Sequence, residues 1–85
     1  MKLYSSPKTL TEEFDMSIRS VQRRISEMKK FPFYRSSIII SGRMVRIKTR
    51  AFEHYLLYGE ALKAGMDVPP IEEDGDERDE RDAAG

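Results

Sequence analysis

The chain has 85 residues, no cysteine, and fifteen basic residues against fifteen acidic ones. This length limits it to one small domain, and the lack of cysteine excludes disulfides and cysteine-based zinc sites. No apolar run approaches the roughly 20 residues needed to cross a bilayer, and the N-terminus lacks a signal-peptide pattern. We therefore expect a cytoplasmic protein without a membrane partner.

The neutral total hides two segments of opposite charge. Residues 1–63 hold thirteen Lys and Arg against six Asp and Glu, a formal charge of +7. Residues 64–85 hold nine Asp and Glu against two Arg, a formal charge of −7. A basic segment followed by an acidic one is typical of proteins that bind a polyanion, most often nucleic acid. A soluble domain with a solubilising tail has the same composition, so the positions of the basic residues must decide.

Two helices are predicted in the first third of the chain. The first covers residues 7–14, because Ser6 can cap free N–H groups and Pro7 loses no hydrogen bond at the first helical position. The second runs from a cap at Ser17 to about Lys29. Its apolar stripe has spacings of three and four and consists of Ile18, Val21, Ile25 and Met28. The link between the helices is about three residues, the length expected of a helix-turn-helix.

A β-hairpin is predicted next, after Pro32 has ended helical structure. The runs Ile38–Ile40 and Arg43–Ile47 are rich in β-branched residues, and Ser41-Gly42 separates them. Two residues with a glycine between such runs indicate a tight hairpin turn. Ile38 and Ile40 are expected to share a face of the first strand. Val45 and Ile47 are expected to share a face of the second, with Arg43 at the tip and Arg46 on the opposite side.

A third helix is predicted from a cap at Thr49 to about Ala64, with Gly65 at its end. Its expected buried stripe is Phe52, Tyr55, Leu56, Gly59 and Leu62. From Glu72 onward the sequence is highly charged and nearly free of apolar residues, so we expect disorder. The predicted fold is α+β: a domain over residues 1–65 with three helices and a two-stranded hairpin, then a disordered acidic tail over residues 66–85.

The second helix carries the clearest binding pattern. A helix turns about 100° per residue, so Arg19, Arg23, Ser26 and Lys30 should point away from the core, with Ser20 and Gln22 on the flanks. Arg can donate twice to guanine, Gln can pair with adenine, and a helix N-terminus favours phosphate. A merely solvated surface uses the same residue types; the short turn and the cap favour DNA. The predicted DNA-binding residues of this helix are Ser17, Arg19, Ser20, Gln22, Arg23 and Lys30.

The hairpin supplies a second basic element, at Ser41, Gly42, Arg43 and Arg46. In a winged helix such a tip lies along the phosphate backbone or enters the minor groove, whose potential attracts Arg. An ordinary tight turn, whose Arg keeps the edge strand soluble, is the alternative.

Three segments carry a resemblance to a known family: S-I-R-S-V-Q-R-R-I at 17–25, S-G-R-M-V-R-I at 41–47 and K-T-R-A-F-E-H-Y-L at 48–56. Over residues 3–58 the chain resembles the excisionase-like winged helix-turn-helix domains of phages and integrative elements, which are related to the DNA-binding domain of MerR-type regulators. The resemblance implies sequence-specific binding of double-stranded DNA in a bacterial or phage-infected cell. It also implies an excisionase's role, in which cooperative binding bends an attachment site and steers an integrase. The segment 30–37 is longer than the family's usual link before the wing.

Other functions remain open at this point. A transcriptional regulator would use the same chemistry, and a protein-interaction module could bind an acidic partner or mimic DNA through its tail. Leu57 and Tyr58 lie off the buried stripe of the third helix and are candidates for self-association. His54 is expected near solvent, and no catalytic, metal-binding or cofactor pattern is present, so we expect neither an enzyme nor a cofactor.

Overall fold

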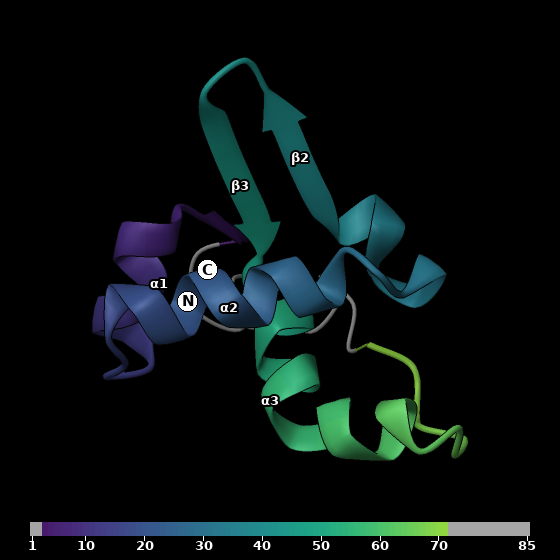
Figure 1. Ribbon diagram of the computed structural model, residues 1–85. Helices are drawn as coiled ribbons and strands as arrows, with labels where there is room; N and C mark the ends of the chain where they lie inside the picture. Colours follow the sequence, from purple (N-terminus) through teal and green to yellow (C-terminus); the bar gives the residue numbers. More distant parts are fainter. Residues whose placement is uncertain (1–2, 72–85) are drawn as a thin grey trace, which may run out of the picture.

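The computed structural model describes residues 3–71, and within them the chain forms a small α+β domain with a three-stranded antiparallel sheet (Figure 1). The elements in chain order are β1 (Tyr4–Ser5), α1 (Pro7–Glu13), α2 (Ile18–Met28), the 3-10 helix η1 (Pro32–Ser37), β2 (Ile38–Ser41), β3 (Met44–Lys48) and α3 (Thr49–Lys63). The predicted disordered tail from Glu72 onward lies outside the described residues. None of the helices in residues 3–71 combines the length and apolarity needed to cross a membrane.

Serine side chains cap the first two helices, as predicted. The Ser6 hydroxyl oxygen accepts from the backbone N–H of Thr9 at 3.2 Å, and that of Ser17 accepts from the N–H of Ser20 at 3.1 Å. Each bond satisfies a donor that the helix itself leaves without a partner. Pro7 occupies the first turn of α1, where its missing N–H costs nothing.

The turn between α1 and α2 depends on a left-handed residue. Asp15 has φ 53°, and the following Met16 N–H donates to the carbonyl of Thr11 at 3.0 Å. This is the bond by which a helix ends in a Schellman motif, where glycine usually takes the left-handed position. Asp tolerates that backbone better than most residues, and the reversal it makes brings α2 back against α1.

The sheet has the order β1-β3-β2, and one of its strands was not predicted. β2 and β3 form the expected hairpin, with Ile38 opposite Ile47 and Ser41 opposite Met44. The loop is therefore Gly42-Arg43, one residue later than predicted. Gly42 has φ 61° whereas Arg43 has a negative φ, the pattern of a type II′ turn, which suits the twist of two strands.

The unpredicted strand, β1, is only two residues long and pairs Tyr4 with Lys48 and Ser5 with Ile47. A buried bond of 2.7 Å joins the hydroxyls of Ser5 and Thr49, and the Thr49 N–H donates to the Leu3 carbonyl at 2.9 Å. Thr49 was predicted to cap α3, and that prediction is wrong. Lys48 occupies the N-cap position, and the Thr49 side chain is fully buried because β1 covers it.

Helical structure also continues past the point predicted for its end. α2 finishes at Met28, and Pro32 begins the 3-10 helix η1 instead of ending a helix. Proline fits the first position of such a turn for the same reason that Pro7 fits α1. The turn carries Tyr34 into the core. At the other end of the chain the Gly65 prediction is confirmed: with φ 77°, it ends α3 through a bond from the Met66 N–H to the Ala61 carbonyl.

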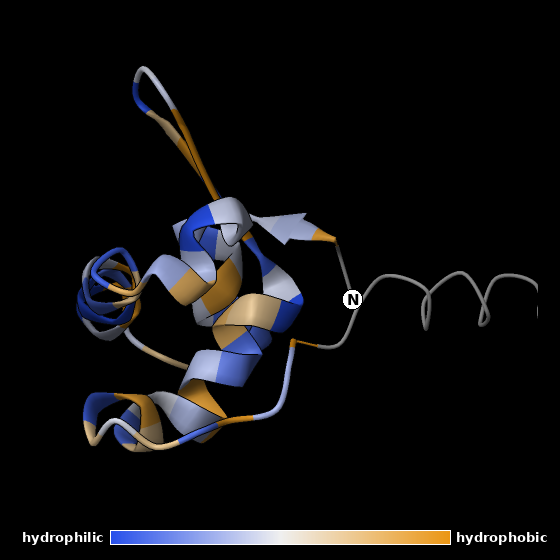
Figure 2. Ribbon diagram, turned by 90° about the vertical axis from the view of Figure 1, so that its right-hand side faces the viewer, coloured by the Kyte–Doolittle hydropathy of each residue, from blue (hydrophilic) through white to orange (hydrophobic). Residues whose placement is uncertain are grey.

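The core lies where α1, α2, η1, β3 and α3 meet, and Figure 2 shows how apolar and polar residues alternate along these elements. Its buried members are Leu10, Val21, Ile25, Met28, Tyr34, Ile47, Ala51, Phe52 and Tyr55. Two predicted core residues are exposed: Ile18 to 46%, since it begins α2 beyond the edge of the core, and Leu56. The buried side of α3 is centred on Tyr55 and Gly59, and Leu56 lies about 100° from Tyr55 around the helix.

The left-handed turn gives a stability prediction. Asp15→Gly relieves the strained backbone and removes a negative charge from the C-terminal end of α1, so we expect the free energy of unfolding to rise by about 1 kcal/mol. Asp15→Ala removes the same charge without relieving the backbone, and it should lower the free energy. Urea unfolding of both variants measures the difference. Equal stability of the two would contradict the backbone argument.

Candidate nucleic-acid interface

One side of α2 presents the predicted row of polar residues to solvent. Arg19, Gln22, Arg23, Ser26 and Lys30 are all exposed, whereas Val21, Ile25 and Met28 on the opposite side are buried. Ser17 and Ser20 differ from the rest of the row. The Ser17 hydroxyl donates to the Ser20 side-chain oxygen at 3.0 Å, so these two serines are occupied with capping the helix.

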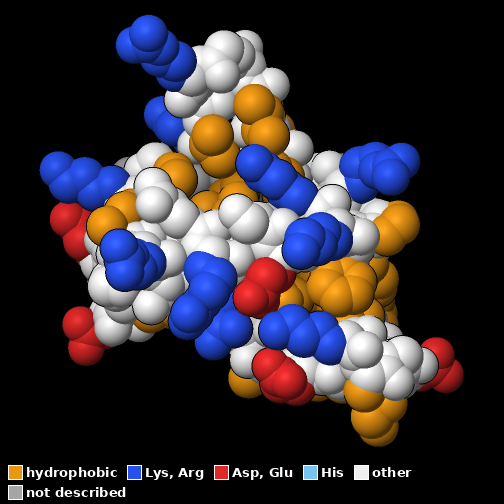
Figure 3. Space-filling view, in the orientation of Figure 1, with side chains coloured by type: hydrophobic (Ala, Val, Ile, Leu, Met, Phe, Trp, Pro, Cys, Tyr) orange, Lys and Arg blue, Asp and Glu red, His pale blue; other side chains and the backbone are white. Residues whose placement is uncertain are grey.

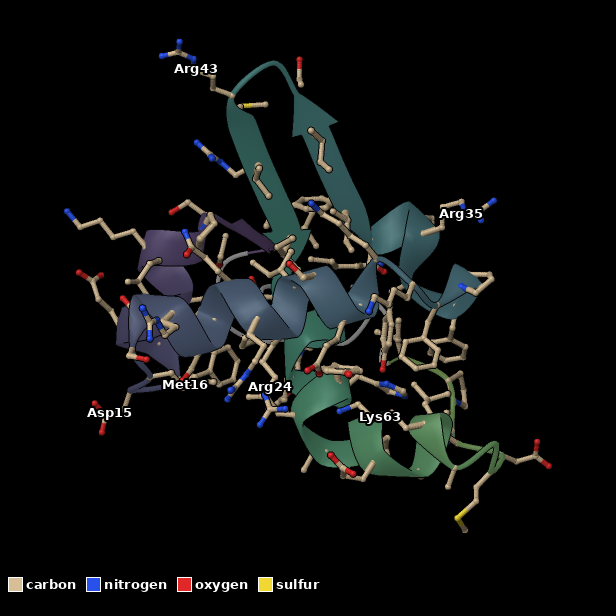
Figure 4. The ribbon with its side chains drawn as sticks, in the orientation of Figure 1. Asp15, Met16, Arg24, Arg35, Arg43 and Lys63 are labelled. Atoms are coloured by element: carbon tan, nitrogen blue, oxygen red, sulfur yellow. The ribbon has the colours of Figure 1, made fainter. Side chains whose placement is uncertain are left out.

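The hairpin tip adds a basic group on the same side of the molecule. Ser41, Gly42 and Arg43 are exposed, and Figure 4 shows the Arg43 side chain extending beyond the turn. Arg46 lies lower on β3, half-buried, with its Nη1 donating to the Val45 carbonyl at 2.9 Å. Figure 2 shows the hairpin leaning toward the side on which α2 lies, and Figure 3 shows Lys and Arg side chains spread over this side.

We call this surface the basic face and define it as Arg19, Gln22, Arg23 and Ser26 of α2, Lys30 just beyond its end, and Arg43 of the hairpin tip. The structure thus brings two separate predicted groups to one side of the domain. That both groups contact DNA stays a prediction.

The single acid of α2, Glu27, does not weaken this face, because its charge is matched within the protein. Its Oε1 accepts from the Tyr55 hydroxyl at 2.6 Å and lies 3.3 Å from the Lys63 Nζ and 3.7 Å from an Arg24 Nη1. Figure 4 shows Arg24 and Lys63 reaching toward each other between α2 and α3. The Tyr55 hydrogen bond, helped by Lys63 and Arg24, holds the pKa of Glu27 below its ordinary value although burial opposes this.

Burial raises the pKa of the Tyr55 hydroxyl, and the hydrogen bond to Glu27 raises it further. The tyrosine therefore stays protonated and remains a donor at every physiological pH. Because it extends from α3 to α2, it fixes the rotation of α2 relative to the core, and with it the direction of the basic face.

The prediction that His54 lies near solvent is wrong. Its side chain is only 5% exposed; Nδ1 lies 2.7 Å from the Tyr34 hydroxyl and Nε2 lies 2.7 Å from the Pro69 carbonyl oxygen. A carbonyl can only accept, so Nε2–H donates to Pro69; in the neutral imidazole Nδ1 then accepts from Tyr34. Burial raises the pKa of Tyr34 to about 12, so it keeps this proton. Helical periodicity could not reveal this network, because residues far away in the sequence cover the imidazole.

This histidine bond attaches the C-terminal segment to the domain. Residues 66–71 turn back along α3, and Ile71 packs against the core. The domain boundary expected at residue 65 stays a prediction, but the packed segment extends six residues beyond it.

The segment also helps to form a hollow of about 300 Å³ beside α3. Leu57, Tyr58, Pro69 and Pro70 give it apolar walls, with Arg50 and Glu53 at its rim. Leu57 is 69% exposed and Tyr58 is half-buried against His54, with ring centroids 4.8 Å apart. Self-association through these two residues stays a prediction. Within residues 3–71 no group of His, Asp and Glu is arranged to hold a metal ion.

Comparisons with models of protein families, with curated proteins and with solved structures each gave no match to this chain.

The contact between Tyr55 and Glu27 gives a prediction with a pH dependence. Tyr55→Phe removes one hydroxyl and should lower the free energy of unfolding by about 1–2 kcal/mol at neutral pH, because a partly buried carboxylate loses its shortest donor. The pKa of Glu27 is lower in the folded chain than in the unfolded one, so the ionised carboxylate stabilises the fold at pH values above its ordinary pKa of 4.5. This contribution is lost as the pH falls through the lowered pKa. The deficit of the variant should therefore shrink in acid.

Urea unfolding at neutral pH and below the carboxyl value measures both effects. Tyr58→Phe is the matched control, since Tyr58 contacts His54 and takes no part in the bond to Glu27; its effect should stay within about 0.5 kcal/mol. A Tyr55→Phe deficit that is the same at both pH values would refute the proposed role of the carboxylate.

Proposed function

We propose that this chain is a sequence-specific double-stranded DNA-binding protein of the winged helix-turn-helix type. In this proposal α1 and α2 are the helix-turn-helix, α2 enters the major groove, and the hairpin of β2 and β3 is the wing. The observation that carries the proposal is the basic face, which joins the exposed side of α2 and the Arg43 tip on one side of the domain. A major groove about 12 Å wide accepts a helix with its side chains.

The roles follow from the positions of the side chains along α2. Arg19, Gln22 and Arg23 lie where a helix in the groove presents its residues to base edges. Ile18, unexpectedly exposed at the start of α2, can contact a thymine methyl group, a contact that the sequence did not suggest. Lys30, just beyond the C-terminal end of the helix, and the helix N-terminus that Ser17 caps suit phosphate. Arg43 suits the phosphate backbone or the minor groove beside the bound helix, with Arg46 behind it.

Within this class we favour an excisionase-like architectural factor of a phage or mobile element, with an integrase as its protein partner. The sequence resemblance supports this choice, and the exposed Leu57 offers a surface for cooperative binding of neighbouring copies. A transcriptional regulator would need the same basic face. Footprinting separates the two, because clustered repeats near a recombination site favour the first and a single promoter operator favours the second.

The candidate of another class is a protein-interaction module. The hollow beside Leu57 and the acidic residues from Glu72 onward are the features that favour it. It predicts no binding of duplex DNA at moderate salt, which separates it from the leading proposal.

The DNA-binding proposal predicts a steep salt dependence. Fluorescence anisotropy of a random-sequence duplex should show binding by the full chain, with the logarithm of the affinity falling linearly with that of the salt concentration, because bound Lys and Arg release counterions. The comparison variant should end at Ile71, since an earlier stop would remove the segment that packs on His54. Tighter binding by this variant would show that the acidic tail competes with DNA. Failure of both forms to bind at low salt would overturn the proposal.

Arg23 provides the test of base recognition. Arg23→Ala should weaken binding to the preferred sequence by about 1–3 kcal/mol and relax the preference at one base pair. Arg23→Lys is the matched control, because it keeps the charge but loses the planar pair of donors that fits guanine. If Lys restored full affinity and selectivity, Arg23 would be a phosphate contact only. Competition binding against single-base variants of a selected sequence measures both effects.

A further inference from the structure

The outer half of the hairpin carries apolar side chains that the rest of residues 3–71 leaves exposed. Ile40 is 54% exposed and Met44 is 43% exposed; Met44 directly follows the Gly42-Arg43 loop, and Ser41 separates Ile40 from it. Figure 1 shows this end of the hairpin projecting away from the helices. The fully buried part of the core ends lower on the hairpin, at Ile47 opposite Ile38, and at the level of Ile40 only its partner Val45 packs partly against the core.

The strand register makes the projecting end apolar on both faces. Ile40 lies opposite Val45 on the face that continues into the core, whereas Met44 lies opposite Ser41 on the other face. A free two-stranded ribbon gains little stability from apolar side chains in water. Apolar side chains gathered at its projecting end are therefore available for contact with a partner.

The charges around the tip select the kind of partner. Residues 38–48 contain Arg43, Arg46 and Lys48 and no acid. Pairing with the hairpin of a second copy would bring three positive charges against three, which opposes that contact. A partner that is negative at its surface and apolar inside satisfies both features of the tip. Duplex DNA has this character, because its phosphates surround a stack of bases.

We propose that Ile40 and Met44 form an apolar wedge that enters the minor groove and partly separates two stacked base pairs, with Arg43 on the flanking phosphates. This inference rests on the proposed function and adds to it the way in which the hairpin deforms DNA. Apolar wedges of this kind kink a duplex by about 20–90°. Pyrimidine–purine steps unstack most easily, so the wedge should prefer a thymine–adenine step over a stiff adenine tract.

The test separates binding from unstacking. The probes are a short alternating thymine–adenine duplex in which 2-aminopurine replaces several adenines, and an adenine-tract duplex of equal length. Anisotropy reports binding, the fluorescence of 2-aminopurine rises when its neighbours unstack, and energy transfer between dyes at the duplex ends reports bending. The variant is the full chain with Ile40→Thr and Met44→Thr. Threonine is polar but favours strands, so it removes the exposed apolar side chains and keeps the hairpin.

Ile39→Thr is the matched control, because Ile39 is also exposed on β2 but lies opposite Arg46, farther from the loop. Met44→Thr alone is the second variant, and a thermal melt of each protein verifies that it folds. We expect the full chain to raise the 2-aminopurine signal and bend the alternating duplex. The double variant should lose most of both effects while its affinity falls by less than about tenfold, and the control should behave as the full chain.

Binding without unstacking, or unstacking that survives in the double variant, would overturn the wedge and leave the DNA-binding proposal intact. No binding of either duplex by the full chain would overturn both. Sedimentation of the full chain as a dimer without DNA, with monomers in the double variant, would show that the apolar tip pairs two copies instead.

Discussion

The burial of one side of α2 is the constraint on which the rest of the structure depends. Val21, Ile25 and Met28 are almost completely removed from water, and each such side chain contributes about 1.5–3 kcal/mol when buried. The hydrogen bond from Tyr55 to Glu27 adds direction to this packing, because it permits only a narrow range of rotation about the helix axis. The residues on the other side of α2 face solvent as a consequence, and they are the ones that bear the basic groups.

The hairpin depends on the same core through β3. Ile47 is buried in the core, and β1 pairs with β3 on the edge that β2 leaves open. The buried hydroxyl pair of Ser5 and Thr49 then joins this corner of the sheet to the start of α3. The hairpin is therefore fixed at its base and exposed at its tip, which is the arrangement required of a projection that contacts a ligand beside α2. For the proposed DNA binding, the arginines would then supply a contribution to the affinity that depends on salt, and the apolar tip would supply one that does not.

The sequence was informative wherever a feature depends on neighbours in the chain. The caps at Ser6 and Ser17, the end of α3 at Gly65 and the hairpin are local, and each was predicted correctly to within a residue. The exposed row of α2 was also predicted correctly, since three of the four residues expected on the buried side of this helix are buried. The predicted burial of Ile18 was wrong, because periodicity identifies a face of the helix but does not indicate where the core ends along it.

The remaining errors come from contacts between distant segments. β1 is too short to leave a pattern, and its arrival turns Thr49 from an expected cap into a buried residue. His54 lies outside the apolar stripe of α3, and only the packing of Tyr34 and Pro69 around it makes it buried. The candidate interface was predictable because it lies on one helix and one turn. The network behind it was not, because Tyr55 and Glu27 meet only in the folded chain.

The central claim is that DNA binds to the side of the domain formed by α2 and the hairpin tip. The most direct measurement is a titration of the isotopically labelled full chain with a short duplex, followed by backbone amide chemical shifts. We expect the largest changes on the exposed residues of α2 and on the Gly42-Arg43 loop, with little change near Leu57 and Pro69. Changes centred on the hollow beside α3, with α2 unaffected, would contradict it.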